Sequence, residues 1–158
     1  MRRAFVSARV PAICEPPGLH RKDGRRVDGL TLYPWSHGKN LVWDFTCRDS
    51  LAASYVSATS KEAGKAAELA EAKKSSHYED LASQYLVTPV AAETLGSWGP
   101  SSLKFIKELG GRIALSNGEP RSTNYLLQSL GMAIQRGNAM SIVGTLPSQR
   151  KLDEIYYL

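Results

Sequence analysis

The chain of 158 residues has only two cysteines and no long apolar run. Cys14 and Cys47 are too few for a disulfide framework and lack the spacing of metal ligands, so we expect a reduced, intracellular protein. No stretch approaches the roughly 20 apolar residues of a membrane-spanning helix, so we expect no membrane partner. A hydrophobic content of 42% and a charged content of 22% predict one globular domain that buries a core.

Most of the chain has no excess of positive or negative charge. The positive excess is concentrated at the N-terminus. Residues 1–26 carry seven Lys or Arg against two acidic residues, whereas residues 27–158 carry thirteen of each sign. The whole net charge of +5 therefore belongs to the first segment. Such a segment suits a polyanion such as nucleic acid, and a solvated basic tail is the alternative that charge alone leaves open.

Proline and glycine placement, together with periodicity, predicts the order β-β-α-β-α-α. We expect residues 1–27 to be irregular, because three prolines and Gly18 interrupt them. The predicted elements are strands at 29–33 and 41–47 joined by a turn at 34–40, a helix at 60–84 and a strand at 86–91. Two further helices are predicted, one at 101–115 closed by Asn117-Gly118 and one at 120–137 ending at a glycine cap. This order implies a mixed α/β fold over residues 28–146, with a small sheet flanked by helices and a C-terminal tail at 147–158.

Charged residues stand at three places where the pattern predicts apolar packing or the opening of a strand. Asp28 precedes the first strand, and Asp44 lies inside the apolar run of the second, where a charge is costly unless it is paired. Alternation places Asp44 on the same face as Val42 and Thr46. Lys74 falls near the centre of the apolar sector of the following helix. If that helix packs on the face that bears Asp44, the three charged side chains converge.

Two interpretations of this arrangement remain open from spacing alone. Two carboxylates at a strand opening suit a hard divalent cation such as Mg²⁺, and a nearby lysine can hold a water or offset charge on a phosphate. Alternatively, Asp44 and Lys74 form a buried ion pair, Asp28 caps a turn, and no metal binds.

The stretch "RRVDG…LVWDFT" resembles the R-P-D…D motif of PD-(D/E)XK nucleases. It is most similar to the restriction-like endonuclease domain at the C-terminus of some non-LTR retrotransposon reverse transcriptases. In that family the lysine of the D-x-K strand is displaced to the following helix, in a K-x-x-x-Y pattern. Here Thr46 stands at the D-x-K position, and the helix carries Lys74-Ser-Ser-His-Tyr78.

The rest of the chain adds to this resemblance more loosely. Residues 10–146 are similar to uncharacterised retroelement-derived proteins of animal genomes. Val27 replaces the proline that usually precedes the first aspartate. The family's core also opens with a helix, which residues 1–27 are not predicted to supply.

The resemblance implies a PD-(D/E)XK-like α/β fold and a metal-dependent DNA endonuclease derived from a retroelement. In this interpretation Asp28 and Asp44 bind Mg²⁺ or Mn²⁺, and Lys74 positions a water or stabilises the phosphate. Tyr78 orients Lys74 or contacts the DNA backbone. The expected partners are DNA and the reverse transcriptase region of the same polyprotein, and the expected location is the nucleus.

The phosphate contacts are expected to come from Arg25, Arg26 and Lys73, without reading of the base sequence. Glu93, after the third strand, either joins the metal shell or caps a loop, and Trp35 either contacts a base or packs. Two alternatives to the nuclease remain. One is an inactive nuclease fold that binds nucleic acid or a protein partner, and the other is a fragment that does not fold alone.

Overall fold

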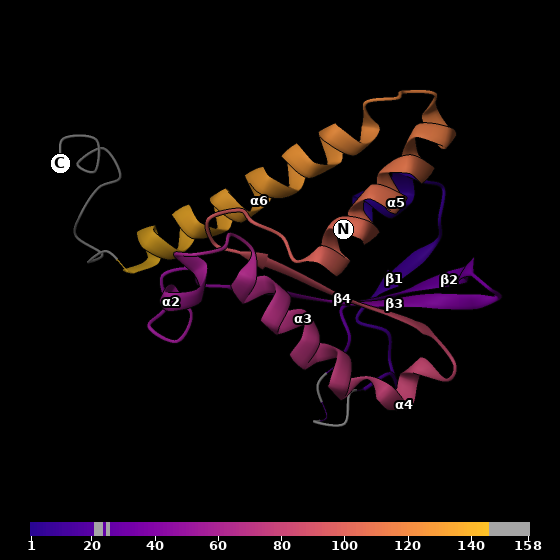
Figure 1. The fold of residues 1–158 in the computed structure, drawn as a ribbon. Coiled ribbons are helices and arrows are strands. Elements are labelled where there is room, and N and C mark those ends of the chain that lie inside the picture. The colour runs from indigo at the N-terminus through magenta and orange to yellow at the C-terminus, as the bar shows by residue number, and fades with distance from the viewer. Residues whose placement is uncertain (21–23, 25, 146–158) are drawn as a thin grey trace.

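The computed structural model of the chain describes residues 1–20, 24 and 26–145. Its fold is mixed α/β, built on a four-stranded sheet with the strand order β1-β2-β3-β4 (Figure 1). The strands are β1 (Ala12–Cys14), β2 (Gly29–Ser36), β3 (Lys39–Arg48) and β4 (Leu86–Glu93). β2 is antiparallel to β1 and to β3, whereas β3 and β4 are parallel. The predicted α/β class and the small mixed sheet are confirmed.

Helices cover both faces of this sheet. They are α1 (Arg2–Ser7), α2 (Val56–Thr59), α3 (Lys65–His77), α4 (Glu79–Ala82), α5 (Pro100–Asn117) and α6 (Ser122–Thr145). α3 and α4 lie on one side, because the parallel connection from β3 to β4 needs a crossover, and α1 and α5 lie on the other (Figure 1). α6 packs on α5 and extends past the sheet. Among the described helices, none combines the length and apolarity that a membrane crossing requires.

The two faces of β3 differ in the way its alternating sequence predicts. Leu41 and Trp43 are buried in the large core cluster together with Phe105 and Ile106 of α5. Val42 is buried on the opposite face, against Tyr78. The face that carries Val42 therefore also carries Asp44, beneath α3.

The β2–β3 hairpin is longer than predicted. Its turn is His37-Gly38, and both residues have positive φ, 49° and 72°, which a two-residue hairpin turn requires. Register irregularities around Pro34 let β2 continue to Ser36. Trp35 is buried in the core with the Arg112 guanidinium 3.7 Å from its ring centre, so it packs rather than offering its ring to a base.

The prediction that residues 1–27 are irregular is wrong. α1 places Phe5 in the core, fully buried and stacked on Trp43 with ring centres 4.4 Å apart. β1 then pairs with β2. The prolines lie between and after these two short elements, so they bound the elements instead of preventing them. α1 also supplies the opening helix that the sequence did not predict.

The helices differ from the predictions at their ends. The expected helix at 60–84 begins at Lys65, after Gly64 with φ 89°, and breaks at Tyr78, whose φ and ψ are −113° and 9°. The helix at 101–115 is confirmed as α5, capped by Gly118 in the left-handed conformation. Gly137 does not end α6, which continues to Thr145. The predicted tail at 147–158 lies outside the described residues.

We expect Phe5→Ala to lower the free energy of unfolding by about 3–5 kcal/mol, because it empties a buried aromatic site between α1 and β3. Val6→Ala on the same helix is the matched control, since Val6 is 70% exposed and its loss should change stability by less than about 0.5 kcal/mol. Urea unfolding of the three proteins measures both effects. Equal stability of Phe5→Ala and the wild type would contradict the role of α1 in the core.

Candidate active site

The candidate site forms at the point where β2 and β3 part. Pairing of the two strands begins at Gly29 opposite Trp43, and the Asp28 N–H donates to the Trp43 carbonyl at 3.1 Å. β3 continues beside β4 as far as Arg48, beyond the last β2 partner. The Asp28 carboxylate takes the next position of the ladder, because its Oδ2 accepts the Phe45 N–H at 2.5 Å.

Asp44 is enclosed by two side chains of the helical segment above it. The Lys74 ammonium and the Tyr78 hydroxyl both donate to Asp44 Oδ2, and Lys74 Nζ also donates to the Phe45 carbonyl at 3.1 Å. Asp44, Lys74 and Tyr78 are 5%, 7% and 1% exposed. Asp44 and Lys74 therefore form a buried ion pair that the Tyr78 hydroxyl completes.

The two carboxyl groups are neighbours. Burial raises the pKa of the Asp28 carboxyl above its ordinary value. The hydrogen bond from the Phe45 N–H and the charge of Lys74 lower this pKa, whereas the charge of Asp44 and a hydrogen bond with it raise it. Asp28, Asp44, Lys74 and Tyr78 thus converge, and their arrangement brings together residues from three separate segments.

The oxygen atoms at this point suit a small divalent cation. Mg²⁺ prefers oxygen ligands, keeps several waters and uses one or two protein carboxylates together with substrate phosphates. Asp28 and Asp44 provide two carboxylates, and the Phe45 carbonyl lies beside them through its contact with Lys74. The described residues add no third acidic, histidine or cysteine side chain to this pair.

α3, which carries Lys74, is held in place by Glu71. The Glu71 carboxylate, 3% exposed, accepts the N–H groups of Ser101 and Ser102 at 3.0 and 2.8 Å and the Ser102 hydroxyl at 2.5 Å. These donors form the first turn of α5, where a negative charge is favoured. Gly99 is required there, because a Cβ would lie 2.2 Å from the Glu71 carboxylate.

A second buried acid fixes the beginning of α3. Glu93, at the end of β4, accepts the Ala66 N–H at 2.9 Å and the Ser50 hydroxyl at 3.3 Å. Glu93 therefore acts as a cap, although of the start of α3 and not of the loop that follows β4. The sequence analysis did not identify Glu71. The usable signal was an acidic residue one turn before Lys74 on the apolar side of the helix.

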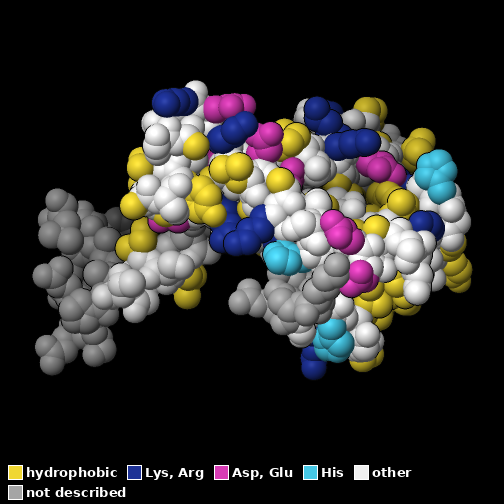
Figure 2. Space-filling view, turned by 60° about the horizontal axis from the view of Figure 1, so that its bottom comes forward, with side chains coloured by type: hydrophobic (Ala, Val, Ile, Leu, Met, Phe, Trp, Pro, Cys, Tyr) yellow, Lys and Arg dark blue, Asp and Glu magenta, His cyan; other side chains and the backbone are white. Residues whose placement is uncertain are grey.

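The expected phosphate contacts lie at the surface where the structure describes them. Lys73 is exposed beside Lys74, and Arg26 is exposed two residues before Asp28. Arg25 lies outside the described residues. Figure 2, which brings the α3–α4 end of the molecule forward, shows Lys and Arg side chains grouped at a hollow in the middle of this face.

Comparison with known proteins does not assign the chain to a family. No protein-family model matches the chain, and no curated protein matches its sequence. The geometry of the site and the motif resemblance are therefore what support a function.

We expect Glu71→Gln to destabilise the protein by about 1–3 kcal/mol. The N–H groups of Ser101 and Ser102 donate to different Glu71 oxygens, so the amide nitrogen that replaces one oxygen turns a donor toward one of these N–H groups. Glu68→Gln on the same helix is the matched control, since the Glu68 carboxylate faces the surface and pairs only with Lys65 among its described contacts. Thermal unfolding measures the difference. Equal losses in both variants would contradict the anchoring of α3 by Glu71.

The raised pKa of Asp28 predicts a pH dependence of the metal-free protein. A carboxyl whose pKa is higher in the folded state loses stability as pH rises from its ordinary value of 3.8 through the folded value. Asn at position 28 keeps an acceptor for the Phe45 N–H and carries no charge. Asp28→Asn should therefore be at least as stable as the wild type near neutral pH and lose this advantage as the pH falls.

Urea unfolding in EDTA at several pH values tests this expectation. Asp49→Asn is the control, because Asp49 is exposed and its side chain accepts the Leu51 N–H in a way that Asn can reproduce. An advantage of Asp28→Asn that grows toward acidic pH would show the opposite sign and contradict the raised pKa of Asp28, which burial and the nearby Asp44 cause.

Proposed function

We propose that the chain is a Mg²⁺- or Mn²⁺-dependent DNA endonuclease domain of the PD-(D/E)XK type, derived from a retroelement. The observation that carries this proposal is the convergence of Asp28, Asp44, Lys74 and Tyr78 where β2 and β3 part. The mixed sheet flanked by helices and the opening helix α1 add support. Phosphodiester hydrolysis is the reaction that these groups suit.

Each residue has a defined part in this proposal. Asp28 and Asp44 are the side chains that would hold a Mg²⁺ or Mn²⁺, which would supply water activation and charge neutralisation at the phosphate. Lys74, fixed between Asp44 and the Phe45 carbonyl, orients a water or stabilises negative charge that develops on the phosphate. Tyr78 restrains the Asp44 carboxylate through its hydroxyl.

DNA binding in this proposal depends on the backbone charge of the substrate. Arg26 and Lys73 are exposed near the site and contact phosphates, and Arg25 belongs to the same basic stretch. Such contacts bind without selecting a base sequence. A retroelement origin makes the reverse transcriptase region of the same polyprotein a second partner and the nucleus the place of action.

One observation favours a second function. The Asp44–Lys74 ion pair forms without a metal, and both of its residues are buried. The same geometry therefore suits an inactive nuclease fold that binds nucleic acid or a protein partner, with the ion pair serving only stability.

Asp44→Asn separates the two functions. The substitution breaks a buried pair and should destabilise the protein by about 3–5 kcal/mol in either case. In the nuclease, however, Mn²⁺ should raise the melting temperature of the wild type and leave that of Asp44→Asn unchanged, because metal stabilises only a protein that binds it. The wild type should also nick supercoiled plasmid with Mg²⁺ or Mn²⁺ and not with EDTA, and Asp44→Asn should not nick it.

Asp49→Asn is the matched control for the metal response, since it removes an exposed carboxylate five residues along from Asp44. It should retain both the nicking and the shift in melting temperature. A wild type that neither nicks plasmid nor responds to Mn²⁺ would exclude the nuclease and leave the binding module.

A further inference from the structure

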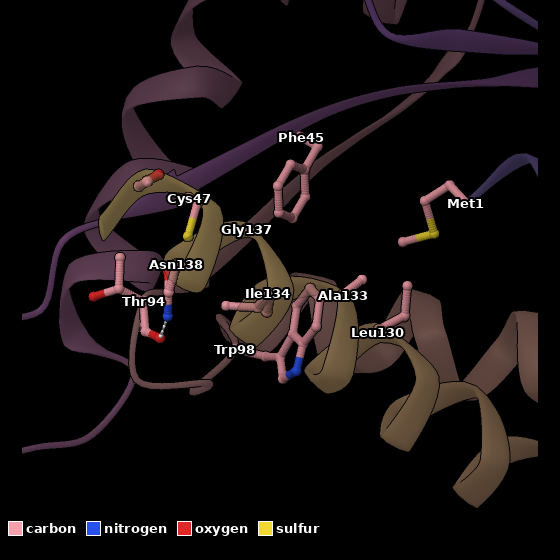
Figure 3. A pocket seen from close by; sticks show the side chains of 11 residues that line it. Met1, Phe45, Cys47, Thr94, Trp98, Leu130, Ala133, Ile134, Gly137 and Asn138 are labelled. Atoms are coloured by element: carbon pink, nitrogen blue, oxygen red, sulfur yellow. Dashed lines mark hydrogen bonds between the residues drawn. The ribbon is translucent and has the colours of Figure 1, made fainter. Parts of the chain in front are cut away.

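A cavity of about 480 Å³ opens on the face of β3 opposite Asp44 (Figure 3). β3 contributes Phe45 and Cys47, the loop after β4 contributes Trp98, and α6 contributes Ile134, Asn138 and Ser141. None of the side chains that line it is charged. The cavity therefore suits an uncharged, largely apolar group more than a phosphate.

Phe45 joins this cavity to the candidate active site. Its N–H is held by Asp28 and its carbonyl by Lys74, whereas its ring points into the cavity (Figure 3). Adjacent Cα atoms of a strand are about 3.8 Å apart and their side chains point to opposite faces, so Asp44 and the Phe45 ring stand back to back. β2 pairs with β3 only as far along β3 as Trp43, in the described part of the chain. Beyond Trp43 the edge of β3 carries the Asp28 carboxylate at Phe45 and, among the described residues, no strand, so the two faces meet along this edge.

We propose that the cavity binds an unpaired nucleobase next to the phosphate that is cut at the site of Asp28 and Asp44, an inference that rests on the proposed nuclease function. Phe45 is 38% exposed, and its ring lies 6.4 Å from the Trp98 ring at an angle of 55°, so both offer an aromatic surface for stacking. A volume of about 480 Å³ falls within the range of roughly 300–1,000 Å³ that holds small ligands.

Polar groups at the rim suit the edge of a base. The Asn138 amide donates to the Thr94 carbonyl at 2.7 Å, which fixes its orientation, and its carbonyl oxygen and the Ser141 hydroxyl can bond a base edge. A base inside a duplex cannot enter such a cavity, because it is stacked and paired. The preferred substrate is therefore DNA with an unpaired nucleotide beside the bond that is cut.

Tryptophan fluorescence with a single-stranded oligonucleotide in EDTA tests the proposal without cleavage. Trp35 and Trp43 are buried in the core, so a base that stacks in the cavity quenches Trp98. The single strand should quench the fluorescence, and a blunt duplex of the same sequence should not. Trp98→Phe should bind the oligonucleotide, measured by anisotropy, and lose the quenching.

Phe45→Leu keeps an apolar side chain and removes the aromatic surface. It should weaken binding of the single strand by ~5- to 150-fold, the loss expected for one base–aromatic stack. Tyr33→Leu is the matched control, because Tyr33 is a 65% exposed aromatic of β2 outside the cavity, and it should bind like the wild type.

Unchanged affinity in Phe45→Leu, or binding of the single strand without quenching of Trp98, would overturn the base pocket. The binding assay contains no metal, whereas the plasmid assay depends on metal and on Asp44. Nicking without base binding therefore removes only the pocket, and base binding without nicking removes only the nuclease.

Discussion

A carboxylate buried within a strand must be matched by hydrogen-bonded positive charge, and this requirement at Asp44 organises the rest of the structure. Lys74 and Tyr78 meet it, and both reach Asp44 only if α3 packs on the Asp44 face of β3. α3 in turn depends on two other buried acids. Its own Glu71 accepts N–H groups at the start of α5, and Glu93 of β4 accepts an N–H at the start of α3. Three buried carboxylates thus fix one helix: α3 donates to Asp44 and Glu93 through Lys74 and Ala66, and its own Glu71 accepts from α5.

The same region of β3 contributes to a site on each face of the sheet, because the pairing with β2 does not reach the end of β3. The open ladder position at Phe45 is taken by the side chain of Asp28, which brings a second carboxyl beside Asp44. Burial, and to a lesser degree the neighbouring charge of Asp44, raises the pKa of Asp28, so the ionised Asp28 carboxylate lowers the stability of the fold. Groups arranged in this way are frequent at functional sites, where a cation relieves the repulsion. On the other face, the Phe45 ring enters the cavity beneath α6.

The ion pair between Asp44 and Lys74 serves stability and chemistry through the same atoms. As a structural pair it satisfies a buried charge, and in the proposed nuclease it holds a cationic group beside a metal site. Stability measurements on Asp44 variants cannot separate these two uses, because both lose the same contact. Stabilisation by metal separates them, because it requires the negative charges of both Asp28 and Asp44.

The sequence by itself determined what depends on local periodicity and capping. The alternation of β3 placed Asp44 opposite Trp43, the helical period placed Lys74 on the buried side, and Gly118 marked the end of α5. These features follow from the geometry of a strand, a helix and a left-handed cap, which a short segment specifies alone.

Only the tertiary structure decided the features whose partners are distant along the chain. α1 forms because Phe5 stacks on Trp43, and its few residues have no strong helical signal of their own. Glu71 accepts the N–H of Ser102, 31 residues further along the chain, and Glu93 accepts the N–H of Ala66, 27 residues earlier. A buried carboxylate looks the same in a sequence whether it caps a helix, pairs with lysine or holds a metal, because its meaning is set by the donors that the fold brings to it.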